Sequence, residues 1–293
     1  MALTLSEAAK LSTDMIQRGV VETILEESPV LRMLPFITVT GNTYKYNQEN
    51  TLGGAQFYAV GGTWTEGTAT FTQKTANLAI LGGDADVDNF LQRTRSNLTD
   101  QRAVQIALKA KSVARTFEQT FITGDTSVDA NSFDGIRKLC AAGQTISSGT
   151  NGGALTLSNL DQVEDLILGA KPDVFLMSRR TRRRLKALLA QSTHYVESGT
   201  AFGRQVMLYD GIPVEVSDFQ PDTETQGSGS NLSSLYAIHF SEADGVAGLQ
   251  NGGIEVIDIG QLETKDAERT RLRWYVSIAL LRDSALARLS AIQ

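Results

Sequence analysis

Cysteine, histidine and proline are scarce in this chain, which has one, two and five of them among 293 residues. One thiol forms no internal disulfide and no cysteine cluster for zinc, so Cys140 is expected to be a small buried apolar side chain. No apolar run approaches the ~18 residues that a membrane-spanning helix requires, so no membrane partner is expected. Few prolines and 26 glycines favour turns and bent strands over a stiff linker.

The sequence also lacks the motifs that position a nucleophile, a phosphate group or a catalytic metal. It contains no GxSxG, no GxGxxG after a strand, no GxxxxGK[ST] and no HExxH, which argues against an enzyme and against a bound cofactor. The segment GDADVDNF resembles the start of a calcium loop, but Asn89 and Arg95 stand where that loop needs glycine and glutamate. We therefore expect no metal there, and the repulsion among its three carboxylates favours a basic partner surface: Asp84, Asp86 and Asp88.

Positive charge is concentrated in one segment, although the net charge of -6 argues against attraction of the whole chain to DNA or to an anionic membrane. The segment MSRRTRRRLKALLAQ predicts a helix that begins after Ser178. At 100° per residue its apolar side comprises Thr181, Leu185, Leu188 and Leu189. The opposite side is a candidate basic surface, formed by Arg179, Arg182, Arg183 and Lys186. Its default role is solvation and contact with acidic surface, and the alternative is non-specific contact with DNA phosphates.

Two further elements are clear from their periodicity. Apolar residues recur at three- and four-residue steps over 97–123, which predicts a long helix with a buried face of Ala103, Ala107, Ala110, Ala114, Phe117 and Phe121. Gly124 is expected to end this helix in the left-handed conformation. The segment TRLRWYVSIALL alternates with period two, which predicts a strand with a core face of Leu272, Trp274, Val276, Ile278 and Leu280.

Residues 44–88 are rich in threonine, aromatic residues and glycine, and they predict a long hairpin. Its inner half has too few apolar residues for a buried face, and an isolated two-stranded hairpin is only marginally stable in water. We therefore expect it to lie against another chain, through candidate subunit-contact residues Phe57, Tyr58, Trp64 and Phe71. Residues 29–41, which follow a predicted helical arm, are also expected to lie across a neighbouring surface.

The order of these parts resembles the major capsid proteins of tailed bacteriophages with the Hong Kong 97-type fold. The resemblance covers nearly the whole chain. It rests on the N-terminal arm, the hairpin, the long helix ending in TGD, and the segments FDGI, MSRRTRRRLKAL, DGIPVEVSD and RLRWYVSIALLRDSALARLSAI. None of these motifs is specific alone, and the specificity lies in their order.

The resemblance implies an α+β fold whose peripheral domain contains a spine helix at about 97–123 and a sheet, with an α/β axial domain inserted in it. The implied divisions are an N-terminal arm over 1–43, an extended hairpin loop over 44–90, a peripheral domain over 91–157 and 255–293, and an axial domain over 158–254. It also implies a virion protein that assembles in the host cytoplasm, through pentamers and hexamers, into an icosahedral shell around double-stranded DNA. The chain begins at the arm without a long charged segment, so either a separate scaffolding protein guides assembly or the chain is already shortened, and Met1 favours the former. The resemblance also implies a portal and packaged DNA, contacted non-specifically, as partners.

Two alternatives stay open. An encapsulin-like cellular shell would share the fold and enclose protein cargo, and the contents of a purified particle would distinguish it. A hydrolase or a DNA-binding regulator is the alternative from a different class. Such a protein would elute from size-exclusion chromatography as a small oligomer, whereas a shell protein would elute in the void volume or as capsomers.

Overall fold

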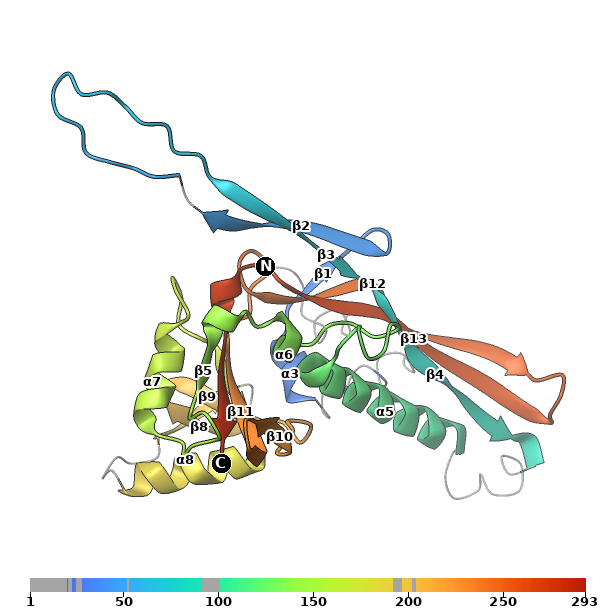
Figure 1. Ribbon diagram of the computed structural model, residues 1–293. Coiled ribbons are helices and arrows are strands. Elements are labelled where there is room, and N and C mark those ends of the chain that lie inside the picture. Colours follow the sequence, from blue (N-terminus) through green and yellow to red (C-terminus); the bar gives the residue numbers. More distant parts are fainter. Residues whose placement is uncertain are drawn as a thin grey trace.

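The computed structural model describes residues 20, 23–24, 28–51, 53–90, 101–191, 197–201 and 204–293. Two sheets with their helices form the body of the molecule, and a two-stranded hairpin projects away from it (Figure 1). The helices are α3 (Pro29–Met33), α5 (Gln101–Thr123), α6 (Ile136–Leu139), α7 (Leu157–Asp165), α8 (Arg179–Gln191) and the short 3-10 helices η1 (Ala142–Gln144) and η2 (Asp283–Ala285). Within these described ranges, no helix has the length and hydropathy needed to cross a membrane.

The first sheet has four strands in the order β1 (Phe36–Thr38), β12 (Val246–Gln261), β13 (Ala267–Leu280) and β4 (Ala79–Asp88). β13 pairs antiparallel with β12 and β4, and β1 pairs parallel with β12. The predicted core face of β13 is confirmed, because all five of its residues are buried. The Trp274 ring lies 5.1 Å from Phe117 of α5 and 5.6 Å from Phe36. The long helix and β1 therefore pack on the same face of this sheet.

The long helix α5 confirms the predicted spine in part. Its described start is Gln101, and residues 97–100 lie outside the described residues. The predicted buried face is confirmed in its C-terminal half, at Ala110, Ala114, Phe117 and Phe121. In the N-terminal half the prediction was wrong: Ala103 and Ala107 are exposed, and Ile106 is buried. Burial of the larger Ile106 side chain removes more apolar surface from water than burial of an alanine.

Gly124 follows the last residue of α5, as expected, but not in the left-handed conformation, because its φ is not positive. A Cβ at this position would lie 2.3 Å from the carbonyl oxygen of Phe133 and 2.5 Å from that of Thr120. Close approach of two backbone segments, rather than a special φ, therefore requires glycine here.

The second sheet has eight strands. Its main path is β5 (Thr145–Ser147), β14 (Leu286–Ile292), β11 (Gly229–Ile238), β6 (Val174–Met177), β9 (Ile212–Val216), β8 (Arg204–Tyr209) and β7 (Glu197–Ala201), and β10 (Glu224–Gln226) pairs with β11. β6 shows how both faces are buried. Phe175 and Met177 pack in a core with residues of α7 and α8, whereas Val174 and Leu176 join the core that contains α5. The two sheets are thus joined through a shared core.

The sheets divide the chain differently from the expected boundaries. Residues 79–88, expected in the hairpin loop, form β4 of the four-stranded sheet, where Asp84 and Asp86 pair with arginines of β13. Residues 246–254, expected in the axial domain, begin β12 of the same sheet. Residues 286–292, expected in the peripheral domain, form β14 beside β11 in the eight-stranded sheet. The chain passes from β13 of one sheet to β14 of the other through the short helix η2. This described stretch contains no linker whose composition could have indicated the boundary in the sequence.

Residues 29–41 are expected to lie across a neighbouring surface, and this expectation was wrong because the segment packs into the core of its own chain. Val30, Leu31, Leu34 and Phe36 are buried in the core that contains α5. Their apolar side chains gain more from this core than from exposure on an arm. The greater part of the expected arm, residues 1–19, lies outside the described residues.

The hairpin consists of β2 (Thr43–Thr51) paired antiparallel with β3 (Thr70–Asn77). Two polar contacts fix its root to the end of β13 and to η2. The Gln48 Nε2 donates to the carbonyl oxygen of Leu280 at 2.6 Å, and the Lys74 Nζ lies 3.0 Å from the Asp283 Oδ1. The loop between the strands extends beyond both sheets (Figure 1).

Candidate functional site

The loop at the end of the hairpin carries exposed apolar side chains. Phe57 is 108% exposed and Trp64 is 78% exposed, while Phe71 on β3 is 67% exposed. Tyr58 is half-buried because its ring stacks on Trp64 at a centroid distance of 4.2 Å. The Thr65 backbone N–H donates to the Tyr58 hydroxyl at 3.0 Å. The structure thus pairs two of the four predicted contact residues with each other and leaves Phe57 and Phe71 without a ring contact in the described part of the chain.

Helix α8 has the two faces that its sequence predicts. Thr181, Leu185 and Leu189 are buried and Leu188 is half-buried. The candidate basic residues are exposed on the other side: Arg179, Arg182, Arg183 and Lys186.

The cations of α8 differ in their partners. The Arg179 Nη2 donates to the Asp218 Oδ2 at 2.7 Å. The Arg180 Nη2 donates to the carbonyl oxygen of Asn231 at 2.7 Å. The side chains of Arg182, Arg183, Arg184 and Lys186 have no ion pair or hydrogen bond within the described ranges. The uncompensated charge of the helix therefore belongs to these four side chains, of which Arg184 is half-buried and the others are exposed.

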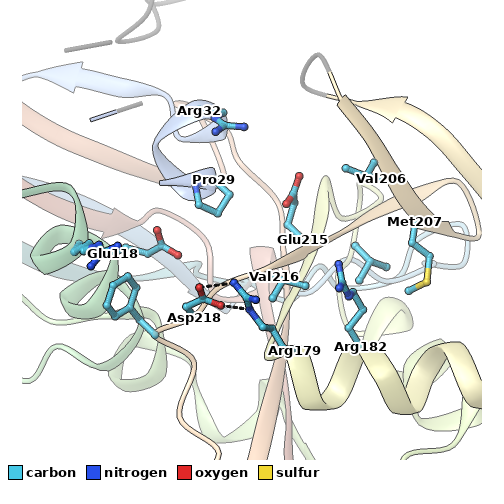
Figure 2. A pocket seen from close by; sticks show the side chains of 13 residues that line it. Pro29, Arg32, Glu118, Arg179, Arg182, Val206, Met207, Glu215, Val216 and Asp218 are labelled. Atoms are coloured by element: carbon cyan, nitrogen blue, oxygen red, sulfur yellow. Dashed lines mark hydrogen bonds and ion pairs between the residues drawn. The ribbon is translucent and has the colours of Figure 1, made fainter. Parts of the chain in front are cut away.

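A cleft of about 640 Å³ lies beside the first turn of α8, between the eight-stranded sheet and the helices α3 and α5 (Figure 2). Its lining has four arginines, three carboxylates and several apolar side chains: Pro29, Arg32, Arg115, Glu118, Arg179, Arg182, Val206, Met207, Val214, Glu215, Val216, Asp218 and Phe219. The lining therefore carries one net positive charge. Arg179 and Arg182 of the candidate basic surface line the cleft, and the Arg182 side chain has no partner among the described residues. Figure 2 shows Arg182 on α8, beside Met207 and Val216.

Hydrogen bonds hold the walls of this cleft in place. The Ser217 hydroxyl, just after β9, donates to Glu118 of α5, whose side chain is buried. The Arg179 guanidinium pairs with Asp218 at the entrance of α8. These two contacts join three separate elements, so the cleft exists before any partner enters it.

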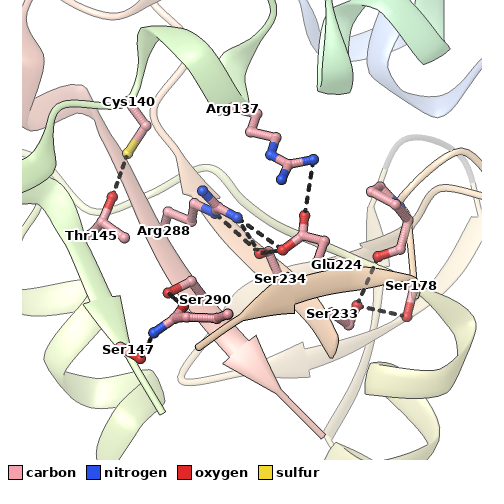
Figure 3. A network of polar contacts seen from close by, with 12 residues as sticks. Arg137, Cys140, Thr145, Ser147, Ser178, Glu224, Ser233, Ser234, Arg288 and Ser290 are labelled. Atoms are coloured by element: carbon pink, nitrogen blue, oxygen red, sulfur yellow. Dashed lines mark hydrogen bonds and ion pairs between the residues drawn. The ribbon is translucent and has the colours of Figure 1, made fainter. Parts of the chain in front are cut away.

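A buried ion pair in the eight-stranded sheet was not predicted from the sequence (Figure 3). The Arg288 Nη2 donates to the Glu224 Oε2 at 2.9 Å, and the Ser234 hydroxyl donates to the same oxygen at 2.5 Å. The Arg137 Nη1, from α6, lies 3.7 Å from the other carboxylate oxygen. Removing one member of such a pair leaves an uncompensated buried charge. No local pattern could have revealed it, because the partners come from β10, β14 and α6.

Cys140 lies beside this network, and its Sγ is 3.5 Å from the Thr145 hydroxyl oxygen. Burial raises the pKa of the Cys140 thiol, which keeps it protonated and unreactive at neutral pH. The expected buried apolar role is therefore met in part, since the residue is half-buried.

The carboxylates that resemble a calcium loop have a basic partner surface within the same chain. Asp84 pairs with Arg271 at 2.7 Å and Asp86 pairs with Arg269 at 2.7 Å, across the β4–β13 ladder. Among the residues that the structure describes, no group of three acidic, histidine or cysteine side chains could hold a metal ion.

A sequence model of the SU10 major capsid protein family matches residues 6–225, which is most of the chain. The chain belongs to this family. It is therefore the major capsid protein of a phage-like icosahedral shell and a component of the virion. As a capsid protein it acts through homo-oligomeric assembly, not through catalysis.

Solved structures show the fold of this capsid protein. It is similar to the SrpI encapsulin of Synechococcus elongatus PCC 7942, with a TM-score of 0.73, 20% identity, and coverage of 91% of this chain and 89% of that chain. The capsid of the native GTA particle gives a TM-score of 0.66 at 16% identity and 91% coverage of both chains. Microbacterium phage Oxtober96 gives a TM-score of 0.66 at 16% identity and 90% coverage of both. The expected Hong Kong 97-type fold is confirmed. No curated protein sequence matches the chain significantly.

Proposed function

We propose that this capsid protein closes its shell around double-stranded phage DNA, and that the hairpin loop is the arm that joins neighbouring subunits. The subunit-joining role of the hairpin loop is supported by the exposure of Phe57, Val60 and Trp64. They belong to a loop that lies outside both sheets (Figure 1). Burying one such side chain is worth roughly 1.5 to 3 kcal/mol. Three of them on a neighbour would contribute roughly 5 to 9 kcal/mol per subunit, which offsets part of the cost of ordering the loop.

We infer that the subunits gather as pentamers and hexamers. A loop that binds a different surface on the next subunit makes a heterologous contact, and such contacts close into rings when the rotation closes. Subunits in rings of five and of six occupy slightly different positions, so the arm must bend. The loop glycines support this, because glycine has the widest choice of backbone conformations and Gly61 already adopts a φ of 83°.

We assign the four-stranded sheet with α5 to the peripheral domain of the capsid fold. The eight-stranded sheet with α7 and α8 is assigned to the axial domain. Sheet membership supports this division, under which β12 would belong to the peripheral domain and β14 to the axial domain.

A separate scaffolding protein, a portal and packaged DNA are the proposed further partners of the shell. The basic surface of α8 supports contact with DNA phosphates, which would be sensitive to salt and would carry no sequence readout.

The arm is tested with the double variant Phe57→Ser and Trp64→Ser. We expect folded subunits that form no shells, because the loop loses its apolar contact area while the body of the molecule is unchanged. Circular dichroism reports the fold, and sedimentation with electron microscopy reports the shells. The matched control is Val128→Ser, since Val128 is 87% exposed but lies after α5 and far from the hairpin loop in the chain. Normal shells from the double variant would refute the arm.

A second candidate function is an encapsulin-like shell that encloses protein cargo. The similarity to the SrpI encapsulin favours it, although that likeness reflects the fold alone. Purified particles distinguish the two functions: nuclease-protected DNA supports the phage shell, and a co-purifying protein without DNA supports the encapsulin-like shell.

A further inference from the structure

In the cleft beside α8, the side chain of Arg182 lies among apolar side chains and has no partner within the described residues. We propose that it binds a polypeptide segment of another protein that carries one carboxylate next to an apolar residue. The carboxylate would pair with Arg182, and the apolar residue would contact Met207 and Val206. This inference goes beyond the proposed assembly contact and does not depend on the hairpin.

The charge of the cleft selects a single carboxylate. Arg179 is already neutralised by Asp218, whereas Arg182 has no partner within the described residues. A guanidinium binds a carboxylate through two parallel hydrogen bonds, which gives both affinity and orientation. The lining as a whole has one net positive charge, so one entering carboxylate makes the site neutral.

The walls of the cleft select a polypeptide rather than a free anion. Val206 and Val214 are buried in the wall, and Met207 and Phe219 are half-buried beside them. Such surfaces provide binding free energy only to a ligand with apolar groups of its own. Because the hydrogen bond between Ser217 and Glu118 already holds the walls, the walls themselves lose little conformational entropy when a segment binds.

The same features disfavour DNA in the cleft. A duplex presents many phosphates on a convex surface, and three carboxylates of the lining would repel them: Glu118, Glu215 and Asp218. Arg183 and Lys186 lie outside the lining, on the exposed side of α8, where phosphates reach them without entering the cleft. The geometry therefore separates Arg182 from its neighbours in function.

The test compares Arg182→Gln with Arg183→Gln, a matched control on the same helix that does not line the cleft. Random short peptides are selected for binding to the purified full-length wild-type protein, and the selected peptides are titrated against both variants. We expect peptides with one aspartate or glutamate beside apolar residues. Arg182→Gln should weaken their binding about tenfold, as for a lost charge-assisted hydrogen bond, and Arg183→Gln should leave it unchanged.

Four results would overturn the proposal. The selected peptides could lack an acidic residue, or fail to appear at all. Both variants could weaken peptide binding equally, which would indicate general attraction to the basic surface of α8. Finally, a short DNA duplex, titrated in parallel, could lose more affinity with Arg182→Gln than with Arg183→Gln, and the cleft would then be a phosphate site.

Discussion

Trp274 is the largest side chain among the fully buried residues of the described structure, and its ring contacts both Phe36 and Phe117. The variant Trp274→Ala is therefore expected to lose about 3 to 5 kcal/mol of stability. Folded domains have only about 5 to 15 kcal/mol in total. We expect insoluble or unfolded chains, measured as the soluble fraction and by thermal unfolding followed by circular dichroism.

The control for this prediction is Trp64→Ala, which removes the same side chain from an exposed position in the hairpin loop. When both proteins are measured as unassembled subunits, this control should melt at the wild-type temperature, because assembly by itself would shift the melting temperature. A Trp274→Ala protein that is soluble and melts like the Trp64→Ala control would show that this face of β13 is not core.

A pH dependence follows from the ion pairs of the β4–β13 ladder. Hydrogen bonds from Arg271 lower the pKa of Asp84, and those from Arg269 lower the pKa of Asp86. Both pKa values are thus below their unfolded value of about 3.9. The pairs therefore stabilise the fold at neutral pH, and this contribution is lost as the pH falls below about 4 through the lowered pKa values.

The corresponding variant is Asp84→Asn with Asp86→Asn. At neutral pH its melting temperature should be slightly lower than that of the wild type, because such exposed pairs contribute little each. At about pH 2 the difference should shrink, since the wild-type carboxylates are then protonated as well. Gly143→Ala, which removes no titratable group and whose added Cβ would meet nothing within 4 Å, is the control and should melt like the wild type at both pH values. An equal difference at both pH values would contradict the role of these pairs.

At the scale of single residues, the sequence predicted burial well where the periodicity of neighbouring residues determines which side chains face the core. Period-two alternation placed five residues of β13 in the core, and all five are buried. The ion pair of Glu224 and Arg288 could not be predicted in this way. It depends on β10 and β14 both lying against β11, which is decided by long-range pairing rather than by neighbouring residues.

At the scale of elements, the end of α5 offers a sharp test of backbone packing. Gly124→Ala places a Cβ against two carbonyl oxygens, that of Thr120 in α5 and that of Phe133 just before α6, which cannot move independently of the backbone segments that carry them. Overpacking of this kind costs about 1 to 3 kcal/mol. Gly143→Ala is the control, because a Cβ there would meet nothing within 4 Å. Urea unfolding should show a clear loss for the first variant and none for the second, and equal stability of the two would refute the tight packing.

Elements were predictable where one helix or strand determines its own pattern. Helix α8 shows this, since its start after Ser178 and both of its faces follow from the 100° step. The boundary of the hairpin was not predictable, because alternating residues over 79–88 fit either a longer hairpin or a separate strand. Pairing with β13 makes these residues a strand of the four-stranded sheet, because Arg269 and Arg271 of β13 form ion pairs with the aspartates of β4.

At the scale of the whole molecule, the order of the parts indicated the capsid fold although no single motif did. The chain leaves the eight-stranded sheet, builds β12 and β13 of the other sheet, and returns through η2 to β14. Such a path is a property of the complete topology, which explains why the membership of the strands in the two sheets does not follow the expected domain boundaries. It also explains the shared core, since β6 presents alternate side chains to the helices of both layers.

The assembly role of the arm makes a final prediction for the whole particle: replacing residues 53–62 with a short Gly-Ser linker should abolish shells and spare the fold. Within the described residues, the side-chain hydrogen bonds and ring contacts of this loop are with the loop itself, such as the hydrogen bond between the hydroxyl of Tyr58 and Thr65. The root stays fixed, because Gln48 and Lys74 still bind the end of β13 and η2. Circular dichroism should therefore match the wild type, while sedimentation should show subunits or capsomers in place of shells. Normal shells would show that the loop is dispensable, and an unfolded chain would show that the loop belongs to the core of its own subunit.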